Sequence, residues 1–256
     1  MTVRAPEPET GEAAGPLTRK LARVVSLSPE ELHLLAEIQI PTRSVSRNRE
    51  IISEGRKYGE MFVLLEGVAI RYRVLHDGRR QILNITLPGD LIGFPACFFE
   101  TALYSISALS DTQVATIPLP QLLSLFERNR RLAGILFWLF SCEAAMYAEH
   151  LTDLGRRSAV ERVAHFLLEL LVRLQAVDLA EERSYRMPLT QELIGDTLGL
   201  SVPHVNRTLR QLRDDGLVAI EDHRVMIKDF DGLATLADFE RSYLSRLRIS
   251  EALAQP

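Results

Sequence analysis

The sequence predicts an α+β protein that consists of an N-terminal β-roll of the double-stranded β-helix (jelly-roll) type, a long dimerisation helix and a C-terminal winged helix-turn-helix. Short apolar runs between residues 51 and 118 are separated by turn signals such as Asp77-Gly78, which is typical of a barrel or sandwich. Helical spacing of the apolar residues then holds from Leu119 to about Val177. Two short helical segments around a glycine and a small hairpin follow.

Composition limits the class of protein. The 256 residues suffice for two domains, and the net charge of −4 gives no overall sign of nucleic-acid binding, so any basic surface must be local. Residues 1–20 are rich in Pro, Glu, Gly and Ala, and lack the apolar segment of a signal peptide, so we expect a disordered arm. The most apolar run, residues 132–140, is too short to span a bilayer, so we expect no membrane partner.

The two cysteines, Cys97 and Cys142, lie far apart in the sequence and form no metal-binding motif. We therefore expect no metal, no cofactor and a reducing, cytoplasmic location. A helix is expected over residues 29–40, with Ser28 as its cap.

Three more helices are expected after the strands, over residues 119–126, 130–154 and 159–175. Ser158 and Glu161 form the signature of a capping box at the start of the third. Apolar residues recur at three- and four-residue spacing in the long helix, which predicts a seam for a second copy, with packing on the chain's own roll as the alternative. The seam residues are Leu132, Ile135, Leu139, Cys142 and Met146.

The motif with functional meaning is "LTQELIGDTLGLSVPHVNRTLRQLRDDGLV", residues 189–218. Thr190 is predicted to cap its first helix, Gly195 to let the second helix approach closely, and Gly199 to make the turn. Ser201 is the expected cap of the second helix and Gly216 its stop.

A small β-wing is expected after this motif, in which Val225 and Ile227 face Val218 and Ile220. A last helix is expected around residues 233–247.

The second helix carries the predicted DNA contacts. Pro203 falls in its first turn, where N–H groups have no intrahelical acceptor, so the proline is compatible with the helix. On the outward face Arg207 suits guanine, Asn206 suits adenine, and Pro203 and Val202 offer apolar contact to bases. The residues placed for phosphate are Thr190, Ser201, His204, Thr208 and Arg210. A solvated amphipathic helix is the alternative for a lone segment, but the two helices, glycine turn and wing together favour DNA binding.

This arrangement resembles the CRP/FNR family of bacterial transcription regulators over roughly residues 21–231, most strongly in the helix-turn-helix and in "LPGDLIG", residues 87–93. The resemblance implies a homodimer packed along the central helices, a cyclic-nucleotide-binding-like sensor, a palindromic operator in double-stranded DNA and contact with RNA polymerase. It divides the chain into a disordered arm (1–20), a sensor β-roll (21–126), a dimerisation helix (127–154), a winged helix-turn-helix (155–231) and a C-terminal helical extension (232–256).

Three departures from the cyclic-nucleotide binders of that family predict a degenerate roll that does not bind cyclic AMP in the usual way. Phe94 stands where they carry a glutamate for the ribose, and residues 100–108 lack their phosphate-binding arginine. Tyr147 and Ala148 stand where they place base-contacting hydroxyl residues. The candidate effector pocket is Phe94, Tyr104, Ser105 and Tyr147.

The chain also lacks the residues on which other sensing chemistries of the family depend. The N-terminal cysteine cluster of its iron–sulfur branch is absent, and His76, His150 and His165 fit surface or packed histidines better than haem ligands. Cys142 is a redox candidate through an intersubunit disulfide, although a small buried hydrophobe explains it better. Pro203 replaces the glutamate with which many relatives read cytosine.

The sequence thus predicts a homodimeric, sequence-specific DNA-binding regulator whose small-molecule effector, if it has one, is undetermined. The alternative is a ligand- or redox-sensing subunit that acts through protein–protein contacts. We expect no enzyme, because the chain carries no nucleophile elbow, no P-loop and no paired catalytic carboxylates in a motif context.

Overall fold

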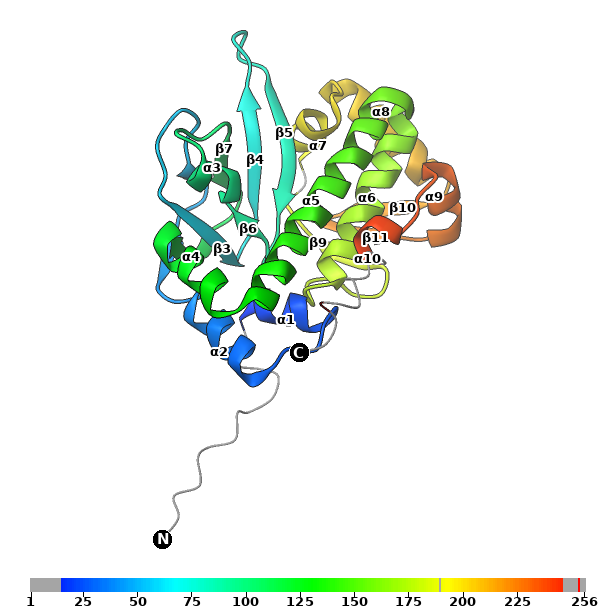
Figure 1. Cartoon of the computed structure of the whole chain (residues 1–256). Helices are drawn as coiled ribbons and strands as arrows, with labels where there is room; N and C mark the ends of the chain where they lie inside the picture. Colours follow the sequence, from blue (N-terminus) through cyan, green and yellow to red (C-terminus); the bar gives the residue numbers. More distant parts are fainter. Residues whose placement is uncertain (1–14, 189, 246–252, 254–256) are drawn as a thin grey trace.

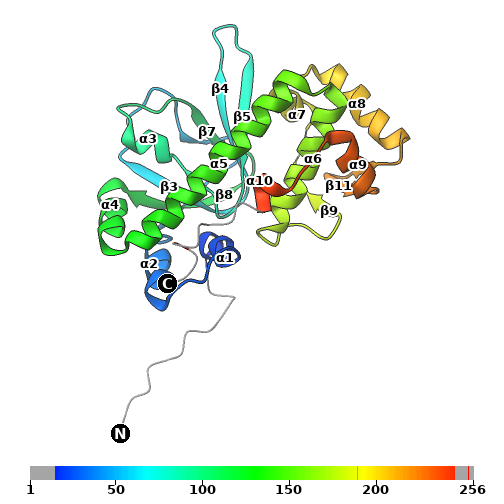
Figure 2. The same ribbon diagram turned by 45° about the vertical axis from the view of Figure 1, so that its right-hand side comes forward.

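A computed structural model of the chain describes residues 15–188, 190–245 and 253, and in it a roll of two β-sheets lies beside a helical C-terminal part (Figure 1). One long helix, α5 (Arg130–Arg156), runs diagonally between the two parts, as the turned view in Figure 2 shows. This arrangement confirms the predicted class of roll, long helix and winged helix-turn-helix.

The roll contains eight strands, β1 (Thr42–Val45), β2 (Glu50–Ile52), β3 (Glu60–Glu66), β4 (Ala69–Val74), β5 (Arg80–Thr86), β6 (Leu91–Ile92), β7 (Ser105–Ala108) and β8 (Thr112–Pro118). They form two antiparallel sheets, in the orders β1-β8-β3-β6 and β2-β7-β4-β5. Phe62, Leu64 and Ile106 are fully buried between the sheets. The predicted hairpin at Asp77-Gly78 is confirmed, since it joins β4 to β5 and Gly78 has a φ of +84°.

Two helices precede the roll, α1 (Pro16–Ala22) and α2 (Pro29–Glu37). Ser28 caps α2 through a complete capping box with Glu31, as expected. The predicted arm is too long, because residues 16–20 belong to α1, whose Leu17 and Leu21 are fully buried. Residues 1–14 of that arm lie outside the described residues.

The short helix α3 (Phe94–Phe98) lies within the roll, between β6 and β7. The helix α4 (Leu119–Arg128) leads from β8 to α5, and α6 (Ala159–Gln175) follows α5. Asn129 caps α5 by accepting a hydrogen bond from the Leu132 amide at 2.8 Å. The predicted capping box of Ser158 and Glu161 is present at the start of α6, and both predicted ends of that helix are confirmed.

The C-terminal part contains α7 (Gln191–Leu198), α8 (Val202–Asp214), α9 (Phe230–Ala237) and α10 (Ser242–Ser245), with the strands β9 (Ser184–Arg186), β10 (Val218–Glu221) and β11 (Arg224–Ile227). Its core is built around α6, and it includes Ile82 and Ile85 from β5, so this part packs against the roll. The single helix predicted over residues 233–247 is wrong. The chain leaves the helix at Asp238, which adopts a left-handed φ of 49°.

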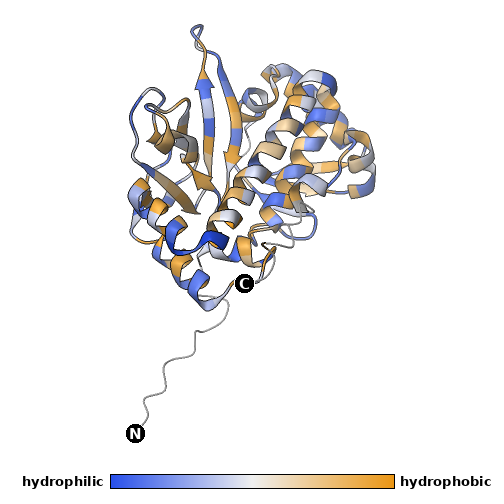
Figure 3. Cartoon of the chain, viewed as in Figure 1, coloured by the Kyte–Doolittle hydropathy of each residue, from blue (hydrophilic) through white to orange (hydrophobic). Residues whose placement is uncertain are grey.

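By length and composition alone, α5 is apolar enough to cross a membrane, and it is the one such helix among the described residues. A core helix of a soluble protein passes the same test. Here α5 lies along the roll, and its Glu143 forms an ion pair with Arg71 of β4, while its Asp153 pairs with Arg157 directly after the helix. Orange and pale segments alternate along it in Figure 3, as in an amphipathic helix.

Candidate functional site

The helix-turn-helix is assembled by α7, a glycine turn and α8. Thr190 caps α7, because its Oγ1 accepts a hydrogen bond from the Leu193 amide at 3.1 Å. Gly199 ends α7 with a left-handed φ of +64°. A Cβ on Gly195 would lie 2.6 Å from the carbonyl oxygen of Leu200, so only glycine allows the turn to pass this close. These three predicted roles are confirmed.

The N-terminus of α8 is capped differently from the prediction. Ser201 is the N-cap residue, but its side chain makes no cap hydrogen bond. An N-cap hydroxyl accepts from the second or third helical N–H. Pro203 at the second position has no N–H, and the amide of His204 donates to the Ser201 carbonyl at 2.9 Å instead. The Ser201 hydroxyl therefore stays exposed at the end of the helix.

The outward face of α8 brings together most of the predicted DNA contacts. Val202, Pro203, Arg207 and Arg210 are exposed, and His204 and Asn206 are half-buried. Neither arginine forms an ion pair with a described residue, so both guanidinium groups present their charge to solvent. Thr208 is 3% exposed on the inward face, so the prediction that it contacts phosphate is wrong.

The wing is confirmed in its register. Val218 pairs with Ile227 and Ile220 pairs with Val225, and β9 adds a third strand beside β11. Gly216 ends α8 at a φ of +73°, where its amide bonds the Arg213 carbonyl at 3.0 Å. The wing is thereby held directly after α8.

The candidate effector pocket of the roll is filled by the protein itself. Arg71 of β4 is 3% exposed, and its guanidinium lies 4.6 Å from the ring centre of Tyr104 and hydrogen-bonds to the Tyr147 hydroxyl. Its Nη1 also pairs with Glu143 of α5 at 2.9 Å. Burial opposes the charge of Arg71, but Glu143 and the two tyrosines outweigh it and raise the pKa of this guanidinium.

The structure thus brings Tyr104 and Tyr147 together, as predicted, but around an arginine that the sequence analysis did not select. Phe94 lies apart from them, because its ring stacks on Phe140 of α5 with centres 3.5 Å apart. Ser105 is buried and accepts a hydrogen bond from the Glu54 amide at 3.0 Å. Arg71 could have been found from the sequence, because it lies two residues after Ala69 and therefore on the same, inward face of β4, where a charged residue is unusual.

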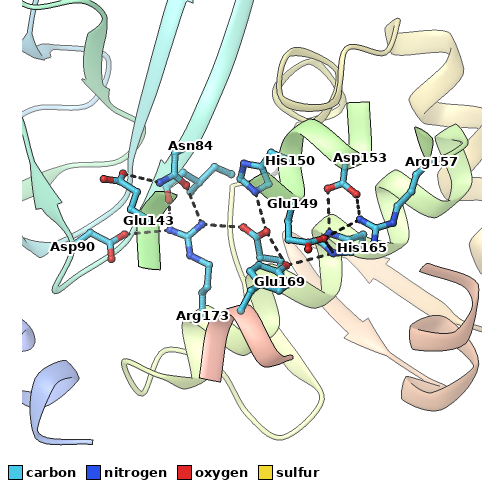
Figure 4. Close-up of polar contacts among 12 residues, drawn as sticks. Asn84, Asp90, Glu143, Glu149, His150, Asp153, Arg157, His165, Glu169 and Arg173 are labelled. Atoms are coloured by element: carbon cyan, nitrogen blue, oxygen red, sulfur yellow. Dashed lines mark hydrogen bonds and ion pairs between the residues drawn. The ribbon is translucent and has the colours of Figure 1, made fainter. Parts of the chain in front are cut away.

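A buried polar network joins the roll to the C-terminal part across α5 (Figure 4). Arg173 of α6 donates to Asn84 Oδ1 at 3.1 Å and to the Ile85 carbonyl at 2.6 Å on β5. It also pairs with Asp90 and Glu169, each at 3.2 Å. Asn84 in turn donates to Glu143 at 3.3 Å, which connects the network to the Arg71 pair.

The network continues along α5 to the point where α5 ends and α6 begins. Glu169, which is 2% exposed, pairs with His150 of α5 at 2.9 Å and accepts from the Tyr243 hydroxyl at 3.1 Å. The buried His165 of α6 lies 3.2 Å from Asp153. Asp153 also pairs at 2.6 Å with Arg157, the residue directly after α5 (Figure 4). Arg157 also pairs with Glu149 and donates a hydrogen bond to the Asp238 carbonyl.

Burial and charge act in opposite directions on the central pair of this network. Burial raises the pKa of Glu169, but His150 and Arg173 outweigh it and lower that pKa to about 2. Burial likewise lowers the pKa of His150, but Glu169 outweighs it and raises that pKa. Each group therefore favours the charged form of the other, and the network favours one arrangement of α6 on α5.

The predicted seam on α5 faces the wrong way. Leu132, Ile135 and Leu139 are buried against the chain's own roll, so the alternative of internal packing is right for them. The outward face carries Phe137 and Leu151, each 70% exposed. Between them this face repeats every three or four residues, through Ser141, Ala144 and Ala148.

The redox candidate lies off that outward face. Cys142 is half-buried and lines a cavity between α5 and α6, and burial raises the pKa of its thiol to about 11. Such a thiol forms its reactive thiolate less readily, and the redox role of Cys142 stays a prediction. Burial raises the pKa of Cys97 to about 11 as well. No group of three or more metal-ligating side chains occurs among the described residues.

Comparison with known proteins agrees with both halves of this architecture. Residues 42–129 match the cyclic nucleotide-binding domain, and residues 161–236 match the Crp-like helix-turn-helix domain. The chain is 30% identical over 213 residues to the transcriptional activator protein Anr of Pseudomonas aeruginosa, which covers 83% of this chain and 87% of that protein. It is 34% identical over 176 residues to the nitrogen fixation regulation protein FixK of Bradyrhizobium diazoefficiens, with 68% and 73% covered.

Among solved structures, FixK2 from Bradyrhizobium japonicum superimposes with a TM-score of 0.69 at 29% identity, and covers 77% of this chain and 96% of that one. A variant of CooA from Carboxydothermus hydrogenoformans shares the fold, with a TM-score of 0.63 at 16% identity over 77% of this chain and 87% of that one.

Proposed function

This chain belongs to the CRP/FNR family of DNA-binding transcription regulators, and from that premise we propose that two copies bind a palindromic operator through α8 of each winged domain. The observation that carries the proposal is the exposed face of α8, where Arg207 and Arg210 stand without ion-pair partners among the described residues. Guanidinium groups in this position suit the base edges and phosphates of a major groove.

Each exposed side chain of α8 receives a role in this proposal. Arg207 reads guanine through its O6 and N7 atoms, and Asn206 reads adenine. Pro203 and Val202 offer apolar contact to a thymine methyl, and Arg210 contacts phosphate. Ser201, His204 and Thr190 complete the phosphate contacts. Thr190 can cap α7 and still donate its hydroxyl proton to a phosphate, because a hydroxyl both accepts and donates.

The proposed dimer forms along the outward face of α5. Phe137 and Leu151 mark its two ends, and the small Ser141, Ala144 and Ala148 between them allow two helices to approach closely. The alternation of three- and four-residue spacing fits left-handed packing of paired helices. Symmetric pairing would place the two α8 helices for half-sites one helical turn apart.

We also propose that this roll does not bind cyclic AMP in the usual way. A cyclic phosphate needs a free cation in the pocket, but Arg71 is already paired with Glu143 and covered by Tyr104 and Tyr147. Breaking a buried ion pair costs more free energy than displacing water from a pocket. The Arg71 pair instead attaches β4 to α5 from inside the pocket.

The remaining partners follow from the premise. Anr, which this chain resembles, is a transcriptional activator protein. By analogy with it, we propose that this protein contacts RNA polymerase at the promoter and acts in the cytoplasm of a bacterium, where the chromosome lies.

The proposal is tested by selecting genomic fragments on the purified protein and measuring the affinity of variants for a retained fragment. Arg207→Ala should lose about 1–3 kcal/mol of binding free energy for that fragment, and little for random DNA. Arg210→Ala should weaken binding to the retained fragment and to random DNA alike, and should lower the slope of log affinity against log salt concentration by about one. Arg47→Ala, on the roll, is the matched control. Unchanged affinity of Arg207→Ala for the retained fragment would overturn the assignment.

A further inference from the structure

A second cavity, separate from the pocket around Arg71, lies between α1, α5, α6 and α10. It has a volume of about 410 Å³. That volume lies within the range of small-molecule sites, about 300–1,000 Å³. One wall is apolar and comes from Trp138, Leu139 and Met146 of α5 and from Val172 of α6.

The charged groups of the cavity are mostly cationic. Lys20, Arg23, Arg173 and Arg241 line it, against the carboxylates of Asp90 and Glu143. Glu143 is already paired with Arg71. Lys20, Arg23 and Arg173 are each paired with a carboxylate too, so an anionic group entering this cavity would bind through their remaining N–H donors.

The cations at the α1 side have donors to spare. Lys20 pairs with Asp90, and an ammonium group has three N–H donors. Arg23 donates to the Gln175 carbonyl at 2.8 Å and to Asp178 at 2.6 Å, and a guanidinium has five donors. Both side chains are partly exposed, at 26% for Lys20 and 43% for Arg23. Arg173, by contrast, is 9% exposed and bonds four partners.

We propose that this cavity binds a small amphipathic carboxylate, whose head contacts Lys20 and Arg23 and whose apolar body lies against Trp138 and Met146. The two ends of the cavity match the two ends of such a ligand. A neutral ligand would leave the cationic end unused, and a fully polar anion would leave the apolar wall uncovered.

The position of the cavity gives such a ligand a regulatory effect, and this consequence rests on the proposed function. Asn84, Asp90 and Arg173 belong both to the cavity wall and to the network that joins the roll to α6 (Figure 4). A carboxylate bound to the remaining donors of Lys20 would share the positive charge that now holds Asp90. Its binding would shift Asp90, and through Arg173 the position of the winged domain.

Trp138 makes the proposal directly measurable, because it is the single tryptophan of the chain and lines the cavity. The full-length protein is titrated with anilinonaphthalene sulfonate, an amphipathic anion that accepts excitation energy from tryptophan. We expect saturable energy transfer from Trp138 at one probe per chain. Decanoate and phenylbutyrate are then added as competitors, to distinguish an aliphatic from an aromatic carboxylate.

Two variants test the two ends of the cavity. Arg23→Met should weaken probe binding about tenfold, because it removes a charge-assisted hydrogen bond. Ala176→Phe should abolish binding by filling the space, since Ala176 lines the cavity. Arg56→Met, which removes the same charge from an exposed turn of the roll, should bind as the wild type does. Circular dichroism checks each fold, and Arg23→Met decides the result if Ala176→Phe does not fold.

Absence of saturable energy transfer, or equal binding by wild type and Arg23→Met, would overturn the proposed site. Failure of both carboxylates to displace the probe would overturn the ligand class. Because these titrations contain no DNA, their failure is distinct from a failure of the proposed function. The regulatory consequence is tested by operator affinity with and without a saturating concentration of the carboxylate that displaces the probe, and an unchanged affinity would overturn it.

Discussion

Glu169→Gln is the most informative change in the network between the roll and the winged domain. The substitution keeps the shape of the side chain but removes the charge that pairs with His150 and Arg173. Glu169 is 2% exposed, so solvent cannot replace those partners. A pKa lowered from 4.5 to about 2 corresponds to roughly 3 kcal/mol of preference for the folded, ionised state. We therefore expect Glu169→Gln to lose about 3 kcal/mol of unfolding free energy at neutral pH.

The pH dependence gives this prediction a definite sign. The pKa of Glu169 is lowered, so its contribution is complete above pH 4.5 and is lost as the pH falls towards 2. The pKa of His150 is raised, so its contribution is complete below pH 6.5 and is lost as the pH rises through the raised value. The variant should lack most of both dependences.

Urea unfolding, followed by circular dichroism across this pH range, measures both quantities. Glu66→Gln is the matched control, because Glu66 is exposed at the end of β3 and lies outside the network. The reasoning is refuted if Glu169→Gln and Glu66→Gln lose equally little stability at pH 7, or if the variant keeps the full pH dependence of the wild type.

Three further changes test single elements. Gly195→Ala should cost about 1–3 kcal/mol of unfolding free energy, because its Cβ would meet the Leu200 carbonyl at 2.6 Å; an unchanged urea midpoint would contradict the close approach. Thr190→Ala should cost about 1 kcal/mol through loss of the α7 cap, also read from urea unfolding, and a loss close to zero would show that the cap is dispensable. Phe137→Glu should convert a dimer to a monomer in sedimentation, whereas Leu123→Glu, on the exposed side of α4, should not; a dimeric Phe137→Glu would place the interface elsewhere.

Local signals in the sequence predicted much of the fold. Helix caps and turns depend on a few neighbouring residues, so they can be predicted without the tertiary structure. Examples are the capping box of Ser158 and Glu161, the turn at Asp77-Gly78 and the helix end at Gly199. The short helix α1 escaped prediction because its seven residues depend on burying Leu17 and Leu21 under the roll, a contact that the local sequence does not contain.

The site was harder to predict where distant segments meet. Arg71 enters the effector pocket from β4, more than seventy residues before its partner Tyr147, so no local motif connects them. On α5 the apolar spacing was real, but apolar residues lie on two faces, and only the structure shows which one the roll covers. Thr208 is polar, which suggests a phosphate contact, but it is buried with Leu209 on the inward face of α8.

The central claim, that this chain reads an operator as a dimer through α8, is tested most directly by hydroxyl-radical footprinting on a genomic fragment that the protein retains. We predict two protected segments related by a two-fold axis, with centres about 34–36 Å apart along the duplex, and loss of both segments in Arg207→Ala. A single protected segment, or protection that Arg207→Ala leaves unchanged, would contradict this account.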